Sequence, residues 1–154
     1  MAGSELSRIE KKIVIRAPRE RVWRAIANIE EFSRWFGVET SGTFAPGARV
    51  EMTSTQEGCR GVAFWVEIEE MTPGRRLSWR WLPGMPEPGV DYSQEPATVV
   101  TFQLDDAPEG TLVTVVESGF DAISLARRAK VFEENEKGWE FQLKSLDKYA
   151  GPAV

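Results

Sequence analysis

Hydrophobic residues at the start of the chain recur first with the period of a strand and then with that of a helix. Ile9–Ala17 alternates apolar and polar side chains, which predicts a strand. Pro18 follows, and proline suits the first turn of a helix because its missing N–H would have no partner there. Val22 and Ile26 share one face of the next, arginine-rich segment, so a short amphipathic helix is predicted after the first strand.

A second short helix is predicted directly afterwards. Asn28 and Glu31 have the spacing of a capping box, in which the first side chain accepts a backbone N–H at the start of a helix. Gly37 is a residue typical of helix ends. The apolar face between these limits carries Phe32, Trp35 and Phe36. We expect this face to seal the short helices against a sheet rather than to contact a ligand.

From residue 38 to residue 119 the period changes to two, which predicts several strands. The expected strands are Val38–Phe44, Arg49–Thr55, Arg60–Met71, Leu77–Leu82, Ala97–Leu104 and Thr111–Ser118. Short turn sequences such as APG and TPGRR join most of them, which favours a curved antiparallel meander. The longer insert Pro83–Pro96 is either a flap or an exposed loop.

The last part of the chain returns to a helical period. Ser124–Ala150 places apolar residues at steps of three and four, including Leu125, Trp139 and Leu143, and predicts one long helix. Gly138 interrupts it, which suggests a bend or a close approach to the sheet. The order of elements predicts a single α+β domain over residues 1–154, with its core at about 8–150 and the long helix packed on one face of the sheet.

The composition restricts the chemistry. The formal charge is −5, which argues against nucleic-acid binding, and no apolar run is long enough to insert into a membrane. The chain has no histidine, so a metal site, a cofactor ligated by histidine or a serine triad is not expected. Cys59 is the single cysteine and cannot form an internal disulfide, which favours the cytoplasm.

Six tryptophans in 154 residues point to an apolar ligand cavity. The candidate ligand-binding residues are Val66, Trp79, Trp81, Phe102, Glu117, Trp139 and Leu143. Glu117 alternates in phase with Val113 and Val115, but Leu112 and Val116 fit the opposite phase, so the sequence leaves its direction open. No residue is assigned a catalytic role, and Glu67, Glu117 and Tyr92 are only weak candidates for one.

Several segments together resemble a known family. The stretch APRERVWRAI, the following EEFSRWF, the turn and strand TPGRRLSWRW, and the ending GTLVTVVESGF with GWEFQLKSL are similar to the SRPBCC superfamily, which includes START lipid-transfer and birch-pollen-allergen-like proteins. The branch that the chain resembles is named for homology to the activator of heat-shock protein 90 ATPase. The resemblance implies a helix-grip fold, in which a curved antiparallel sheet wraps around the C-terminal helix and encloses an apolar cavity.

The resemblance and the composition together favour a binding protein for a small apolar or amphipathic ligand, such as a lipid, an aromatic compound or a polyketide-like compound. Two alternatives remain open: an enzyme of the cyclase or hydrolase type that uses the same cavity, and a module that modulates a chaperone ATPase. A chaperone and a second copy of the chain are the protein partners under consideration. The motif positions place Trp79 and Trp81 on the strand after the turn, and Trp139 on the long helix.

Overall fold

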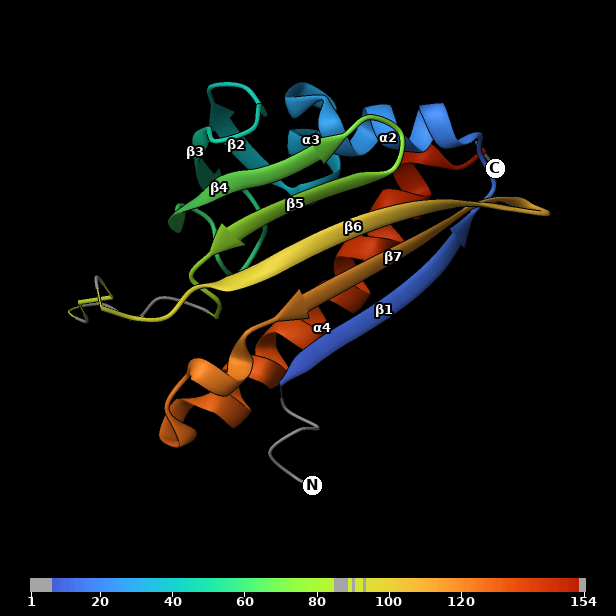
Figure 1. Ribbon diagram of the computed structural model, residues 1–154. Helices are drawn as coiled ribbons and strands as arrows, with labels where there is room; N and C mark the ends of the chain where they lie inside the picture. Colours follow the sequence, from blue (N-terminus) through green and yellow to red (C-terminus); the bar gives the residue numbers. More distant parts are fainter. Residues whose placement is uncertain (1–6, 85–88, 90, 93, 153–154) are drawn as a thin grey trace.

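The computed structural model describes residues 7–84, 89, 91–92 and 94–152 (Figure 1). Its elements, in chain order, are β1 (Arg8–Ile15), α2 (Arg19–Ala27), α3 (Ile29–Phe36), β2 (Val38–Ser41), β3 (Arg49–Ser54), β4 (Ala63–Thr72), β5 (Arg76–Trp81), β6 (Thr98–Ala107), β7 (Gly110–Ser118), the 3-10 turn η1 (Phe120–Ala122) and α4 (Leu125–Ala150). The predicted order of one strand, two short helices, a run of strands and one long helix is therefore confirmed.

The strands form one antiparallel sheet in the order β1-β7-β6-β5-β4-β3-β2. Every neighbouring pair except β1 and β7 is consecutive in sequence, so the sheet is a meander whose first strand returns to pair with the last. Figure 1 shows the sheet curving around α4, which crosses one of its faces. These features define the α+β helix-grip architecture that the resemblance implied.

Local signals explain the two short helices that lie between β1 and β2. The Asn28 side chain accepts a hydrogen bond from the backbone N–H of Glu31 at 3.0 Å, as the capping-box spacing predicts. Gly37 ends α3 at a φ of 77°, in the left-handed region that glycine adopts without strain. Phe32, Trp35 and Phe36 are buried and fix α3 to the core.

The long helix α4 packs through one face. Its buried residues are Val131, Phe132, Trp139, Leu143, Leu146 and Ala150. Leu125, which the periodicity included in this face, is 79% exposed, because the first turn of α4 lies beyond the apolar contact. Among the described residues, no helix is long and apolar enough to cross a membrane.

Of the two predicted roles of Gly138, the close approach of helix and sheet is not supported, and the bend stays a prediction. A Cβ atom built on Gly138 meets no heavy atom within 4 Å, so no close approach of helix and sheet requires glycine there. Instead, Gly138 faces open space beside the sheet.

The insert Pro83–Pro96 lies partly outside the described residues. In the described part, the Gly84 N–H donates to the Asn135 side chain at 3.1 Å, and Arg127 pairs with Glu95. Both contacts connect the insert to α4.

Candidate ligand-binding cavity

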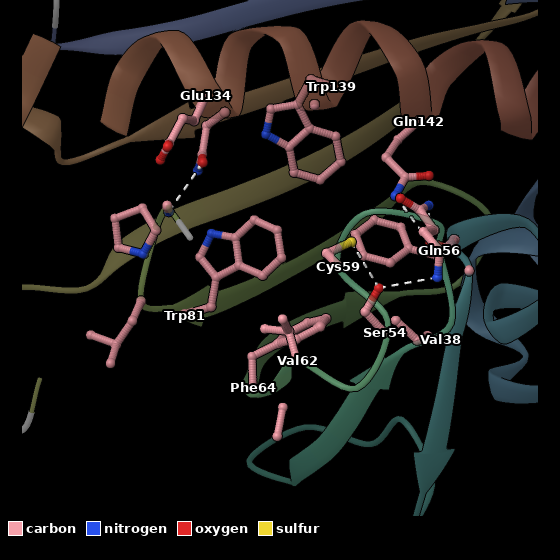
Figure 2. Close-up of a pocket in the computed structure, with 18 of the residues that line it drawn as sticks. Val38, Ser54, Gln56, Cys59, Val62, Phe64, Trp81, Glu134, Trp139 and Gln142 are labelled. Atoms are coloured by element: carbon pink, nitrogen blue, oxygen red, sulfur yellow. Dashed lines mark hydrogen bonds between the residues drawn. The ribbon is translucent and has the colours of Figure 1, made fainter. Parts of the chain in front are cut away.

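A cavity of about 560 Å³ lies between α4, α3 and the β2–β5 end of the sheet (Figure 2). This volume is in the range that holds small organic ligands. The apolar lining residues include Phe36, Val38, Val62, Phe64, Trp65, Trp81, Leu82, Pro83 and Trp139. The polar lining residues include Ser54, Gln56, Cys59, Tyr92, Glu134, Asn135, Lys137 and Gln142.

Helical spacing brings the α4 residues of the lining to one face. Asn135, Gly138 and Gln142 follow one another at steps of three and four, and Trp139 lies beside them. Figure 2 shows Trp139 reaching from α4 toward Trp81 on β5. The lining therefore combines one helix face with one sheet face.

The buried carboxylate of Glu117 lies behind the part of the cavity wall that Trp81 and Trp139 form, and it accepts a hydrogen bond from each of them. Glu117 on β7 is fully buried, so the structure resolves its direction in favour of the inward phase. Its oxygens accept from the indole N–H groups of Trp81 and Trp139, both at 2.8 Å, and from the Asn135 amide at 2.9 and 3.0 Å. Thr98 also donates to it. Because indole N–H groups can only donate, this arrangement suits an ionised carboxylate.

The Glu117 bonds decide what the cavity offers to a ligand. The indole N–H groups of Trp81 and Trp139 are already engaged, so at these two residues a ligand meets the rings rather than the donors. Asn135 donates to Glu117 and accepts from Gly84, and so it connects the insert to the same network.

The predicted ligand-binding residues fall into two groups. Trp81 and Trp139 line the cavity, and Glu117 lies one hydrogen bond behind them. The other four are buried in the core and do not belong to the lining: Val66, Trp79, Phe102 and Leu143. A role in binding for any of the seven stays a prediction.

Several lining residues have no signal in the sequence that separates them from the core. Phe36 sits on the apolar face of α3, where burial was expected, yet it lines the cavity as well. Val38, Val62 and Phe64 alternate like any other inward strand residues. Gly138 carried the one usable signal, because a glycine within a long helix indicates a position where a side chain is missing.

Amide groups form a polar end of the cavity. The Phe36 carbonyl oxygen accepts from Gln56 Nε2 at 2.9 Å and from Gln142 Nε2 at 3.0 Å. Near it, Ser54 Oγ lies 3.1 Å from the Cys59 sulfur and accepts from the Gln56 backbone N–H at 3.2 Å. The single cysteine thus faces a cavity rather than only a loop.

Lys137, a charged residue of the lining, lies toward solvent. The Lys137 side chain is 74% exposed and pairs with Glu133 at 2.9 Å. The hydrogen bond that Lys137 donates to Glu133, together with the charge of Glu133, raises the pKa of Lys137 above its usual value. Arg80, next to Trp81 in sequence, points to the other face of the sheet and pairs with Glu67 and Glu69, as the strand alternation predicts. Among the described residues, no cluster of side chains suited to a metal ion occurs.

A curved antiparallel sheet that grips a long C-terminal helix defines a helix-grip protein. Residues 16–151 match the model of the family described as activator of Hsp90 ATPase homolog 1-like protein, and the chain belongs to this family. The comparison with curated proteins gave no match.

Solved structures show the same fold at low sequence identity. Protein Ms6760 from Mycobacterium smegmatis is 16% identical in sequence. The match covers 97% of this chain and 94% of that protein, with a TM-score of 0.77. Protein CV1439 from Chromobacterium violaceum is 22% identical, with coverage of 96% and 99% and a TM-score of 0.73. The Aha1 dimer from Colwellia psychrerythraea is 19% identical, with coverage of 93% and 95% and a TM-score of 0.68.

Proposed function

We propose that this protein binds a small apolar or amphipathic molecule, such as a lipid, an aromatic compound or a polyketide-like compound. The observation that carries the proposal is the cavity of about 560 Å³, whose walls carry aromatic and aliphatic side chains on the sheet side and the rings of Phe36 and Trp139 on the helix side. Each 100 Å² of apolar ligand surface removed from water contributes about 2.5 kcal/mol before the costs of association.

The wall is organised before a ligand arrives. Trp81 and Trp139 are each fixed by a hydrogen bond to Glu117, and their ring centroids are 5.8 Å apart. Side chains that are already held in place lose little conformational entropy on binding. This supports binding through ring contacts rather than through rearrangement of the core.

The surroundings of the three candidate catalytic residues favour binding over catalysis. Glu67 is on the outer face of the sheet and pairs with Arg49 and Arg80. Glu117 accepts hydrogen bonds on both oxygens and lies behind the wall. Of the three, Tyr92 alone lines the cavity. None of these three residues therefore offers a free carboxylate in contact with a substrate in the cavity.

Gly138 provides a direct test, because it lines the cavity and a Cβ atom added there meets no heavy atom within 4 Å. We expect Gly138→Leu to weaken binding of the neutral fluorophore prodan by about tenfold or more, measured by fluorescence titration. Gly138→Ala should weaken it less and should also stabilise the fold by about 0.5–1 kcal/mol, because alanine favours a helix interior.

Lys144→Leu is the matched control, since it adds the same side chain to an exposed position of α4 outside the cavity lining. This variant should bind prodan like the unchanged protein. If the Gly138→Leu and Lys144→Leu variants bind prodan with equal affinity, prodan binds elsewhere and the cavity is not its site.

Location and partners remain proposals of the same kind. We propose a cytoplasmic protein because its single cysteine is a free thiol. A chaperone partner rests on the family description, and a homodimer rests on the dimer of the Colwellia relative. Light scattering of the purified chain tests the dimer, and ATP turnover of the host chaperone with and without the chain tests the partner.

A further inference from the structure

We propose that the cavity selects an organic cation, meaning a ligand with an apolar body that carries an ammonium group. This inference rests on the proposed function and adds the charge of the ligand to it. It follows from the aromatic rings at one end of the cavity, the buried charge behind them and the placement of the other charged residues.

Aromatic rings meet at one end of the cavity. The ring centroid of Trp81 lies 5.8 Å from that of Trp139, 6.4 Å from that of Phe36 and 6.1 Å from that of Phe64. All four residues line the cavity. The face of an aromatic ring attracts a cation, and tryptophan does so more strongly than tyrosine or phenylalanine.

A buried negative charge lies directly behind these rings. Glu117 is fully buried, and within the described part of the chain its hydrogen-bonding partners are the neutral side chains of Trp81, Thr98, Asn135 and Trp139. Three of the four also line the cavity. None of them neutralises the carboxylate, so its charge acts on whatever occupies the adjacent space. In a low-dielectric surrounding this attraction is stronger than in water, and salt screens it only weakly.

The hydrogen bonds also make the rings better partners for a cation. An indole whose N–H donates to a carboxylate has more electron density on its ring than an indole in an apolar surrounding. Trp81 and Trp139 both donate to the same carboxylate at 2.8 Å. The ring faces and the carboxylate therefore both attract a positively charged ligand.

The remaining charged lining residues do not oppose this selection. Lys137 is directed to solvent, where it pairs with Glu133. Glu134 adds a second acidic side chain to the lining. An anionic ligand would instead meet Glu134 at the wall and Glu117 behind it. The geometry thus favours cations over both neutral and anionic ligands of the same shape.

Three probes of nearly the same shape test the inference: benzyltrimethylammonium, its neutral isostere neopentylbenzene, and benzylsulfonate. Their affinities are measured by competition with prodan. We expect benzyltrimethylammonium to bind about tenfold or more tightly than neopentylbenzene, and benzylsulfonate to bind most weakly.

Two variants assign the selectivity to its source. Glu117→Gln removes the charge at nearly constant volume, and we expect it to reduce the ratio of the affinity for benzyltrimethylammonium to that for neopentylbenzene to within about threefold. Trp81→Phe keeps an aromatic ring but removes one indole, and it should reduce the preference several-fold. Near-ultraviolet circular dichroism checks that each variant is folded, and Trp81→Phe carries the test if Glu117→Gln does not fold.

The outcomes separate this inference from the proposed function. If neopentylbenzene or benzylsulfonate binds the unchanged protein as tightly as the cation, the selection of cations is wrong and the apolar cavity stands. The inference is also wrong if both folded variants keep the full preference. If none of the three probes and no prodan binds, the proposed function itself fails.

Discussion

At the scale of single residues, Glu117 shows what a strand pattern leaves undecided. Its alternation with Val113 and Val115 is plain in the sequence, but Leu112 and Val116 on the opposite phase are also apolar. The choice depends on which face of the sheet the helix covers, and that is a property of the whole fold. The structure buries Glu117, and its donors come from β5, β6 and α4, three elements that no local spacing connects.

Trp139 gives a prediction at this scale. It is 2% exposed, contacts the ring of Phe102 at a centroid distance of 5.6 Å and donates to Glu117. We expect Trp139→Ala to lower the free energy of unfolding by about 3–5 kcal/mol, as for other large aromatic truncations in a core. Urea denaturation measures the change.

Trp139→Phe is the comparison that separates packing from hydrogen bonding. It keeps a ring but leaves Glu117 without one of its donors, and we expect a loss of about 1–3 kcal/mol. If Trp139→Ala costs no more than Trp139→Phe, the indole does not anchor α4 through packing.

At the scale of elements, signals carried by a few neighbouring residues were sufficient to predict the helices and strands. The Asn28 cap, the Gly37 end of α3 and the two-residue period of the strands all appear in the structure as the sequence indicated. The contribution of α3 to the cavity was not predictable, because an apolar helix face looks the same whether it covers a core or borders a cavity. Gly138 does not mark a close approach of helix and sheet, since the fold leaves the space beside it open.

The joint between α2, α3 and the end of α4 gives a second prediction. Glu31 accepts from Arg21 at 2.7 Å, from Arg24 at 2.9 Å and from Tyr149 at 3.1 Å. Burial raises the pKa of Glu31, but the hydrogen bonds from Arg21 and Tyr149 and the nearby positive charges outweigh burial and leave the pKa below its usual value. Ionised Glu31 therefore stabilises the fold above its ordinary pKa, and this contribution is lost as the pH falls through the lowered value.

We expect Glu31→Gln to destabilise the protein by about 1–2 kcal/mol at neutral pH. The difference from the unchanged protein should shrink in acid, where Glu31 itself becomes protonated. Thermal melts of both proteins between neutral pH and about pH 3 measure it. A difference that stays constant over this range would mean that the charge of Glu31 contributes nothing to the joint.

At the scale of the whole molecule, the cavity lies at the β2–β5 end of the sheet. β1 contacts α4 directly, and at the cavity the rings of Trp81 on β5 and Trp139 on α4 meet at a centroid distance of 5.8 Å. The sequence and its resemblance predicted a sheet, a gripped helix and a cavity between them. They did not predict where along the sheet the cavity lies, so four inward residues were assigned to it that belong to the core beneath: Val66, Trp79, Phe102 and Leu143.

A cavity of this kind should bind neutral ligands independently of surface charge. We expect the affinity for prodan not to fall between about 0.1 M and about 1 M salt, although the screening length decreases from about 10 Å to about 3 Å. Fluorescence titration at the two concentrations measures this. Binding that weakened tenfold would indicate an anchor other than apolar contact.

The central claim, that a ligand lies against Trp81 and Trp139, is tested most directly by the indole N–H resonances of the ¹⁵N-labelled protein. Single Trp→Phe variants assign the six indole signals. On titration with prodan, the signals of Trp81 and Trp139 should shift and saturate together, whereas that of Trp23 on α2, outside the lining, should stay in place. Unmoved signals from Trp81 and Trp139 while prodan binds, or a shift at Trp23 in their stead, would contradict the claim.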